Sequence, residues 1–147
     1  VLDRLRGAPV RLEEKLKGVP EEVLTAKEGD SWSIKEQVGH LTMVELLWDA
    51  RTSDFLEGKT ELTAADLNNL PTKKRDFQSA DLSELLATFR ERRARLVKRL
   101  EQFTVETAGQ SAHHPRLDKP MRVIDHAFFA AEHDDHHLAK IHGMLER

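Results

Sequence analysis

Five of the chain's eight histidines fall within its last 22 residues. They are His126, His133, His136, His137 and His142. Successive residues of an α-helix are rotated by about 100°, so His133 and His137 point the same way, one turn and about 6 Å apart. Two imidazoles at this spacing can chelate one metal ion. A metal site needs at least a third ligand, which must come from elsewhere in the chain.

His40 is the candidate for that third ligand. It shares a helical face with Val44 and Leu47, so it is expected to project into the interior and away from water. A polar side chain on an apolar face is costly unless it finds a partner. A metal shared with His133 and His137 is one such partner, and a backbone carbonyl is the alternative. Spacing alone does not choose between them.

The remaining histidines are weaker candidates. His126 precedes His133 by seven residues and shares its face, two turns away, so we interpret it as a core or supporting residue. His136 points about 60° away from His133 and would ligate only if the helix were rotated. His113 and His114 lie in a polar connection, where we expect them to be exposed to solvent.

Several other kinds of active site are excluded. The chain has no cysteine, so it has no thiolate nucleophile and no thiolate metal site. It has no His-Glu-x-x-His motif. Glu36 precedes His40 by four residues and Glu132 precedes His136 by four, whereas di-iron bundles use Glu-x-x-His. A mononuclear three-histidine centre, able to act as a Lewis acid or lower the pKa of a bound water or thiol, is the simpler hypothesis.

The elements that must position these residues are helices. A first helix is expected from about Leu2 to Lys17, with its continuity put in question by Gly7-Ala8-Pro9. A second begins after Ser33, because Ser33 with Glu36 forms a capping-box pattern, and it extends as far as Gly58. Apolar residues then recur at helical spacing, at Ile34, Val38, Leu41, Val44, Leu47, Trp48 and Phe55.

The connection from Gly58 to Ala80 is polar and long for a compact bundle, and we expect a short helix from Thr63 to Leu67 within it. A link of this length can return the chain to the other end of the bundle, which allows the flanking helices to run parallel. Asp81 with Glu84 is expected to cap the third helix. Its inner face would be Leu82, Leu85, Leu86, Phe89, Leu96, Leu100 and Phe103.

The third helix also contains a highly basic segment, from Arg90 to Arg99, which we interpret as a solvated outer face. After a second polar connection, Thr104 to Lys119, a fourth helix is expected with Pro120 in its first turn. Its apolar positions would be Val123, Ile124, Phe128, Ala131, Leu138, Ile141 and Leu145. No segment shows sustained strand alternation, so the fold class is all-α, a four-helix bundle.

Length and composition limit the class of protein. The chain's 147 residues favour a single domain, residues 1–147. Its 33% charged residues and lack of a long apolar run argue against a membrane protein, and the N-terminal residues lack the apolar run of a signal peptide, so we expect a cytoplasmic protein. The net charge of -3 lacks the basic excess that nucleic-acid binding needs, so the expected partner is a small-molecule substrate.

Two segments of the sequence resemble a known family. The run Trp32-Ser33-Ile34-Lys35-Glu36-Gln37-Val38-Gly39-His40-Leu41, with Glu45 after it, resembles the second helix of the DinB-like (YfiT-like) superfamily of metal-dependent enzymes. The segments Pro120-Met121-Arg122-Val123-Ile124-Asp125 and Phe128-Phe129-Ala130-Ala131-Glu132-His133-Asp134-Asp135-His136-His137-Leu138-Ala139-Lys140-Ile141 look like that family's last helix. The resemblance spans nearly the whole chain.

The resemblance carries expectations of its own. It implies a four-helix bundle in up-down-down-up order and a divalent ion, nickel or zinc, held by one histidine of the second helix and a His-x-x-x-His pair of the fourth. Those positions correspond to His40, His133 and His137, the same three that helical geometry indicates. Relatives include thiol-dependent S-transferases and isomerases as well as metal-dependent hydrolases, and members are often homodimers, which is the state we expect here.

Three functions remain open from the sequence. The first is a transferase that uses a low-molecular-weight thiol as cofactor, the second is a metal-dependent hydrolase, and the third is a non-catalytic, stress-related metal-binding bundle. Glu132 and Asp134 flank the ligands and either orient a ligand or lie on the surface. Charged residues in the connections are candidates to bind an acidic thiol, namely His114, Lys73, Lys74 and Arg75.

Overall fold

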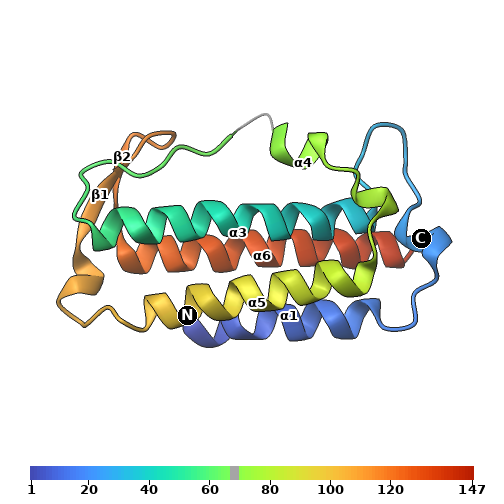
Figure 1. Cartoon of the computed structure of the whole chain (residues 1–147), viewed down its shortest axis with the longest axis horizontal. Coiled ribbons are helices and arrows are strands. Elements are labelled where there is room, and N and C mark those ends of the chain that lie inside the picture. Colours follow the sequence, from blue (N-terminus) through green and yellow to red (C-terminus); the bar gives the residue numbers. More distant parts are fainter. Residues whose placement is uncertain (67–69) are drawn as a thin grey trace.

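Four long helices form the protein in this computed structural model, which describes residues 1–66 and 70–147. They are α1 (Leu2–Leu16), α3 (Ile34–Leu56), α5 (Leu82–Leu100) and α6 (Val123–Leu145). Figure 1 shows α1 and α6 running in one direction and α3 and α5 in the other. The fold is therefore a four-helix bundle in up-down-down-up order, as expected.

Each long helix packs against two others. α3 contacts α5 and α6, and α1 contacts the same two helices from the opposite side. α3 and α5 are thus parallel neighbours, and the connection between them returns along the length of the bundle (Figure 1). The parallel pair confirms that this connection is long because it must span the bundle.

The start of α3 has the expected cap. The Ser33 side chain accepts a hydrogen bond from the Glu36 backbone, and the Glu36 carboxylate accepts one from the Ser33 backbone. Two helix-terminal N–H groups are satisfied in this way. α5 is capped differently, because Asp81 accepts from the backbone N–H of Ser83 and Glu84 completes no box.

Pro9 lies within α1 without ending the helix. A proline has no N–H, so the carbonyl of Leu5, four residues earlier, loses its usual helical donor. The Arg93 side chain supplies a replacement, since its Nη1 donates to Leu5 O at 3.0 Å. The helix is continuous from Leu2 to Leu16, and the expected interruption at Gly7-Ala8-Pro9 is wrong.

The basic segment from Arg90 to Arg99 is not the wholly solvated face that the sequence suggested, because Arg93 is buried. Its guanidinium is 1% exposed and binds both oxygens of Asp134, at 2.6 and 2.8 Å, and Oε1 of Glu45. One side chain of α5 therefore joins carboxylates of α3 and α6 to the backbone of α1. The neighbours Arg90 and Arg95 are exposed, as predicted for the rest of this face.

The connections contain short elements that the sequence analysis missed or misplaced. They are α2 (Glu21–Leu24), α4 (Leu70–Lys74), two 3₁₀ turns, η1 (Phe77–Ser79) and η2 (Thr107–Gly109), and a hairpin of β1 (Ser111–His114) and β2 (Lys119–Arg122). Residues 63–66 are not helical, so the helix expected there is wrong, and its last residue, Leu67, lies outside the described residues. Pro120 lies in β2 and α6 begins at Val123.

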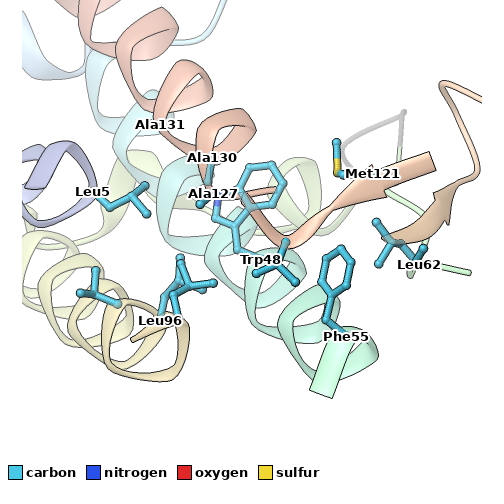
Figure 2. Packing of buried hydrophobic residues seen from close by; sticks show 13 residues of the cluster. Leu5, Trp48, Phe55, Leu62, Leu96, Met121, Ala127, Ala130 and Ala131 are labelled. Atoms are coloured by element: carbon cyan, nitrogen blue, oxygen red, sulfur yellow. The ribbon is translucent and has the colours of Figure 1, made fainter. Parts of the chain in front are cut away.

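The buried apolar residues form two clusters along the bundle axis. Figure 2 shows one of them, in which Trp48 of α3 lies beside Ala127 and Ala130 of α6. Small side chains on α6 leave room for the indole, which explains why the inner face of α6 uses alanines. Ile124 and Phe128 are 37% and 46% exposed, so their expected core position is wrong. Within the described part of the chain, no helix is long and apolar enough to cross a membrane.

Candidate metal centre

Three imidazoles from α3 and α6 meet at mid-bundle. His40 comes from α3, and His133 and His137 come from successive turns of α6. One ring nitrogen from each lies within 4.8 Å of the others. Their ring centroids are 4.5 to 5.3 Å apart. The structure thus brings together the three histidines that the sequence analysis selected, while the ion itself remains a prediction.

The separation of two of these nitrogens suits a metal. Nε2 of His40 lies 3.3 Å from Nε2 of His133. Two nitrogens each 2.0–2.1 Å from a tetrahedral zinc ion would lie about 3.3 Å apart. Nδ1 of His133 is buried and has no hydrogen-bond partner among the described residues, so no group at that nitrogen fixes the tautomer of this ring. His133 is free to present Nε2 as a ligand.

Gln37 fixes the orientation of His137. Nδ1 of His137 donates to Oε1 of Gln37 at 2.6 Å, so its Nε2 carries the lone pair. Hydrogen bonds of this kind orient ligating histidines in metal sites. Gln37 is not among the residues that spacing indicates, although it precedes His40 by about one helical turn and so shares its side of α3.

Thr72 is placed to orient His40 in the same way. Its hydroxyl lies 3.3 Å from Nδ1 of His40, on the ring edge opposite the nitrogen that faces His133. With the proton on Nδ1 and donated to Thr72, Nε2 of His40 is free to ligate. Thr72 belongs to α4, in the long connection, so that connection contributes directly to the site.

Burial keeps all three imidazoles neutral. Desolvation is the largest cause, and it lowers the pKa of His40 to about 4, of His133 to about 3 and of His137 to about 2. The neighbouring imidazoles lower the pKa of His133 and His137 further. At pH 7 the three rings therefore carry lone pairs and no charge, which is the state that binds a metal ion.

The three histidines line a pocket of about 870 Å³, large enough for a small organic molecule. Apolar side chains form much of its wall, including Trp32, Val44, Leu47, Trp48 and Phe129. Trp32 packs on His40 with ring centroids 4.8 Å apart, and Trp48 packs edge-on against His133 at 5.5 Å. An ion held here would be reached from this pocket.

The other histidines divide into a surface and a buried group. His136 and His142 are exposed, and His136 contacts His137 by its ring edge without joining the cluster. His126 is buried in the core, with Nε2 3.1 Å from the Thr52 hydroxyl. His114 is 2% exposed, so the expectation that it is exposed is wrong: β1 directs alternate side chains inward, and His114 is one of them.

The other charged candidates lie outside the cluster. Glu132 is exposed and pairs with Arg4, while Asp134 is buried against Arg93, so neither orients a ligand imidazole in this structure. Glu45 is the second carboxylate on Arg93. Lys73, Lys74 and Arg75 are exposed, and none of them lines the described pocket.

Comparison with known proteins agrees with this architecture. The family model of the DinB superfamily matches residues 4–141. Among solved structures, the chain is similar to YfiT from Bacillus subtilis, described as a probable metal-dependent hydrolase with an unusual four-helix bundle topology. The two share 20% sequence identity and a TM-score of 0.88, over 99% of this chain and 84% of that one. No curated protein matches the chain.

Proposed function

The chain belongs to the DinB superfamily, and from its three-histidine cluster we propose that it is an enzyme with a mononuclear divalent metal centre. The observation that carries the proposal is the direction of the rings. Gln37 leaves Nε2 of His137 unprotonated, Thr72 is placed to accept the Nδ1 proton of His40, and both rings line the same pocket as His133. Neutral imidazoles arranged in this way form a donor set for zinc or nickel.

Each group near the proposed centre has a separate role. His40, His133 and His137 would hold the ion, and Gln37 and Thr72 would hold two of those rings in the ligating tautomer. Trp32 and Trp48 pack on His40 and His133 and keep water from that side of the rings. An ion with an open position would act there as a Lewis acid and lower the pKa of a bound thiol or water.

A thiol-dependent S-transferase is the first activity we propose. The chain contains no cysteine, so a sulfur nucleophile must come from a small thiol that enters the pocket. In such a transfer a sulfur–carbon bond forms while the bond from carbon to its leaving group breaks, and the thiol proton passes to solvent. No oxidant or reductant is consumed. The apolar wall suits an uncharged electrophile beside the thiol.

Hydrolysis is the second candidate, and the similarity of fold to YfiT supports it. A hydrolase needs no thiol, so one assay separates the two activities. We propose to load the protein with zinc or nickel and measure product formation from a chlorinated aromatic, an epoxide and an ester, each with and without a thiol. Product formed only with thiol supports the transferase, and thiol-independent ester cleavage supports the hydrolase.

Two histidine variants of α6 provide a matched control for this assay. His137→Ala removes a proposed ligand, whereas His142→Ala removes an exposed histidine of the same helix. Activity should be lost in the first variant and retained in the second. A metal-loaded wild type that is inactive under every condition, or equally active as His137→Ala, would favour the non-catalytic bundle.

A further inference from the structure

Positive charge lines the pocket in addition to the three histidines. Arg51, Arg116 and Lys140 all line it, and Asp66 is the single acidic residue among the lining residues that the structure describes. The whole chain, by contrast, has a net charge of -3. The pocket is thus locally cationic within an acidic protein, which favours anionic ligands.

Arg51 is the most unusual of these cations because it is buried without an ion-pair partner. It is 1% exposed, its Nε donates to the Thr63 carbonyl at 2.9 Å, and its guanidinium lies 5.8 Å from the centre of the Trp48 ring. Within residues 1–66 and 70–147, no carboxylate forms a salt bridge with it. Asp54 acts on Arg51 only through space, since its oxygens are engaged by Thr63 and Lys59.

Arg93 provides the comparison. It is equally buried, but two carboxylates and a carbonyl satisfy its guanidinium. A buried cation without such partners is costly, and an anionic ligand would supply the missing partner. Desolvation lowers the pKa of Arg51, and guanidinium remains charged in proteins even so.

His114 adds an unsatisfied buried donor to the pocket wall. Its Nδ1 accepts a hydrogen bond from the Leu117 backbone, so the proton of the neutral ring is on Nε2. That N–H is buried and has no acceptor in the described part of the chain. Burial, with the charges of Arg51 and Arg116, lowers the pKa of His114, so the ring stays neutral in this positive field.

We propose that Arg51, together with His114 and Arg116, forms an oxyanion-binding subsite for a carboxylate or phosphate group of the small molecule that enters this pocket. The parallel N–H groups of the Arg51 guanidinium can bind either group, because both offer paired oxygens. Arg116 lies in the exposed turn between β1 and β2 and adds long-range attraction from the rim.

The position of Trp48 relates this subsite to the histidines. The centre of its indole ring lies 5.5 Å from the centre of the His133 ring and 5.8 Å from the Arg51 guanidinium. Trp48 thus adjoins both the proposed subsite and the histidine cluster, and a ligand held by Arg51 shares one pocket with the three imidazoles. This extends the proposed function, because it assigns the substrate or thiol an anionic group separate from its reacting end.

The test uses metal-free protein, so that it does not depend on the metal centre. Inorganic phosphate and malonate would be titrated calorimetrically into wild type, Arg51→Met, Arg116→Gln and the control Arg95→Gln, an exposed arginine of α5. We expect saturable binding to wild type, about tenfold or more weaker binding to Arg51→Met, a smaller loss for Arg116→Gln, and no change for Arg95→Gln. The tighter probe identifies the group as phosphate or carboxylate.

Two further measurements make the result decisive. Arg51→Met should unfold at a midpoint no lower than wild type, because it removes an unpaired buried charge. If it fails to fold, Arg116→Gln, a surface change, decides the question. Zinc binding by Arg51→Met should equal that of wild type, so loss of the subsite is distinguishable from failure of the metal centre. Absence of binding to wild type, or equal binding by wild type and both pocket variants, would overturn the proposal.

Discussion

At the scale of single residues, the hydrogen bond from His137 to Gln37 determines which nitrogen of that ring faces the pocket. A histidine without such a bond divides its population between two tautomers, and only one of them ligates. Gln37 supplies this bond across the interface between α3 and α6 at 2.6 Å. The amide is thus expected to contribute to metal affinity without touching the ion.

Gln37→Leu tests that role. The substitution keeps the size of the side chain and removes the acceptor, so zinc affinity should fall by roughly 10- to 100-fold. Competition with a chromophoric chelator measures the change. Gln102→Leu, at an exposed position just beyond α5, should bind zinc like wild type. Equal affinities in the two variants would show that Gln37 does not orient the ligand.

Only part of the site is predictable from the sequence. Helical spacing indicates which three histidines meet, because His133 and His137 share one helix and His40 breaks an apolar stripe. It does not identify Thr72 or Arg51, whose partners or surroundings come from other elements. A contact between residues 32 positions apart, such as His40 and Thr72, depends on how the long connection folds back.

At the scale of elements, Arg93 compensates for the hydrogen bond that Pro9 removes from α1. The proline leaves the Leu5 carbonyl without its helical donor, and the arginine donates to it while binding carboxylates of two further helices. All four long helices therefore meet at one guanidinium. Both carboxyl groups, Glu45 and Asp134, have pKa values raised by burial, an effect that Arg93 opposes.

Arg93→Met should be strongly destabilising. It would leave two buried carboxyl groups without a cation and one carbonyl without a donor, so we expect the free energy of unfolding to fall by about 3–5 kcal/mol at pH 7. Urea denaturation measures the change. Arg95→Met, on the exposed face of the same helix, should change stability by less than about 0.5 kcal/mol. A loss below about 1 kcal/mol for Arg93→Met would contradict the role assigned to this network.

The lack of a side chain at Gly39 allows the long connection to pack closely against α3. A Cβ placed on Gly39 would lie 2.3 Å from the Phe77 ring, so the 3₁₀ turn η1 packs directly on the helix backbone. Gly39→Ala should destabilise the protein by about 1–3 kcal/mol, whereas Gly7→Ala, with its nearest neighbour at 3.9 Å, should stabilise it by up to about 1 kcal/mol. Thermal or urea unfolding of both variants tests the contrast, and the same sign in both would refute it.

The long helices are predictable from the sequence, whereas the short elements are not. Ser33 with Glu36 and the apolar spacing after them correctly predict the start and the inner face of α3. The hairpin of β1 and β2 has strands of four residues, too short to display an alternating pattern. Ile124 and Phe128 follow helical spacing yet lie outside, because alanines of α6 provide the inner face against Trp48 (Figure 2).

At the scale of the whole molecule, the buried histidines make stability depend on pH. His126 is 1% exposed, and burial lowers its pKa from 6.5 to about 4. Below pH 6.5 the unfolded chain binds a proton at this residue, whereas the folded chain does not until about pH 4. Acidification through this window therefore favours unfolding.

His126→Leu should reduce this acid sensitivity. Between about pH 7.5 and 5.5, wild type should lose about 1 kcal/mol more unfolding free energy than the variant, because the variant lacks that proton-binding site. Urea denaturation at the two pH values measures the difference, with His142→Ala, an exposed residue, as the control. Parallel pH dependence in wild type and His126→Leu would count against the assignment.

The homodimer stays a prediction, and the mass of the purified protein in solution tests it.

The central claim is that His40, His133 and His137 bind one divalent ion, and elemental analysis tests it most directly. Wild type, His137→Ala and His142→Ala would be incubated with zinc or nickel, dialysed together and analysed for bound metal. We predict about one ion per chain in wild type and His142→Ala, and little in His137→Ala. Metal absent from wild type, or retained equally in His137→Ala, would contradict the claim.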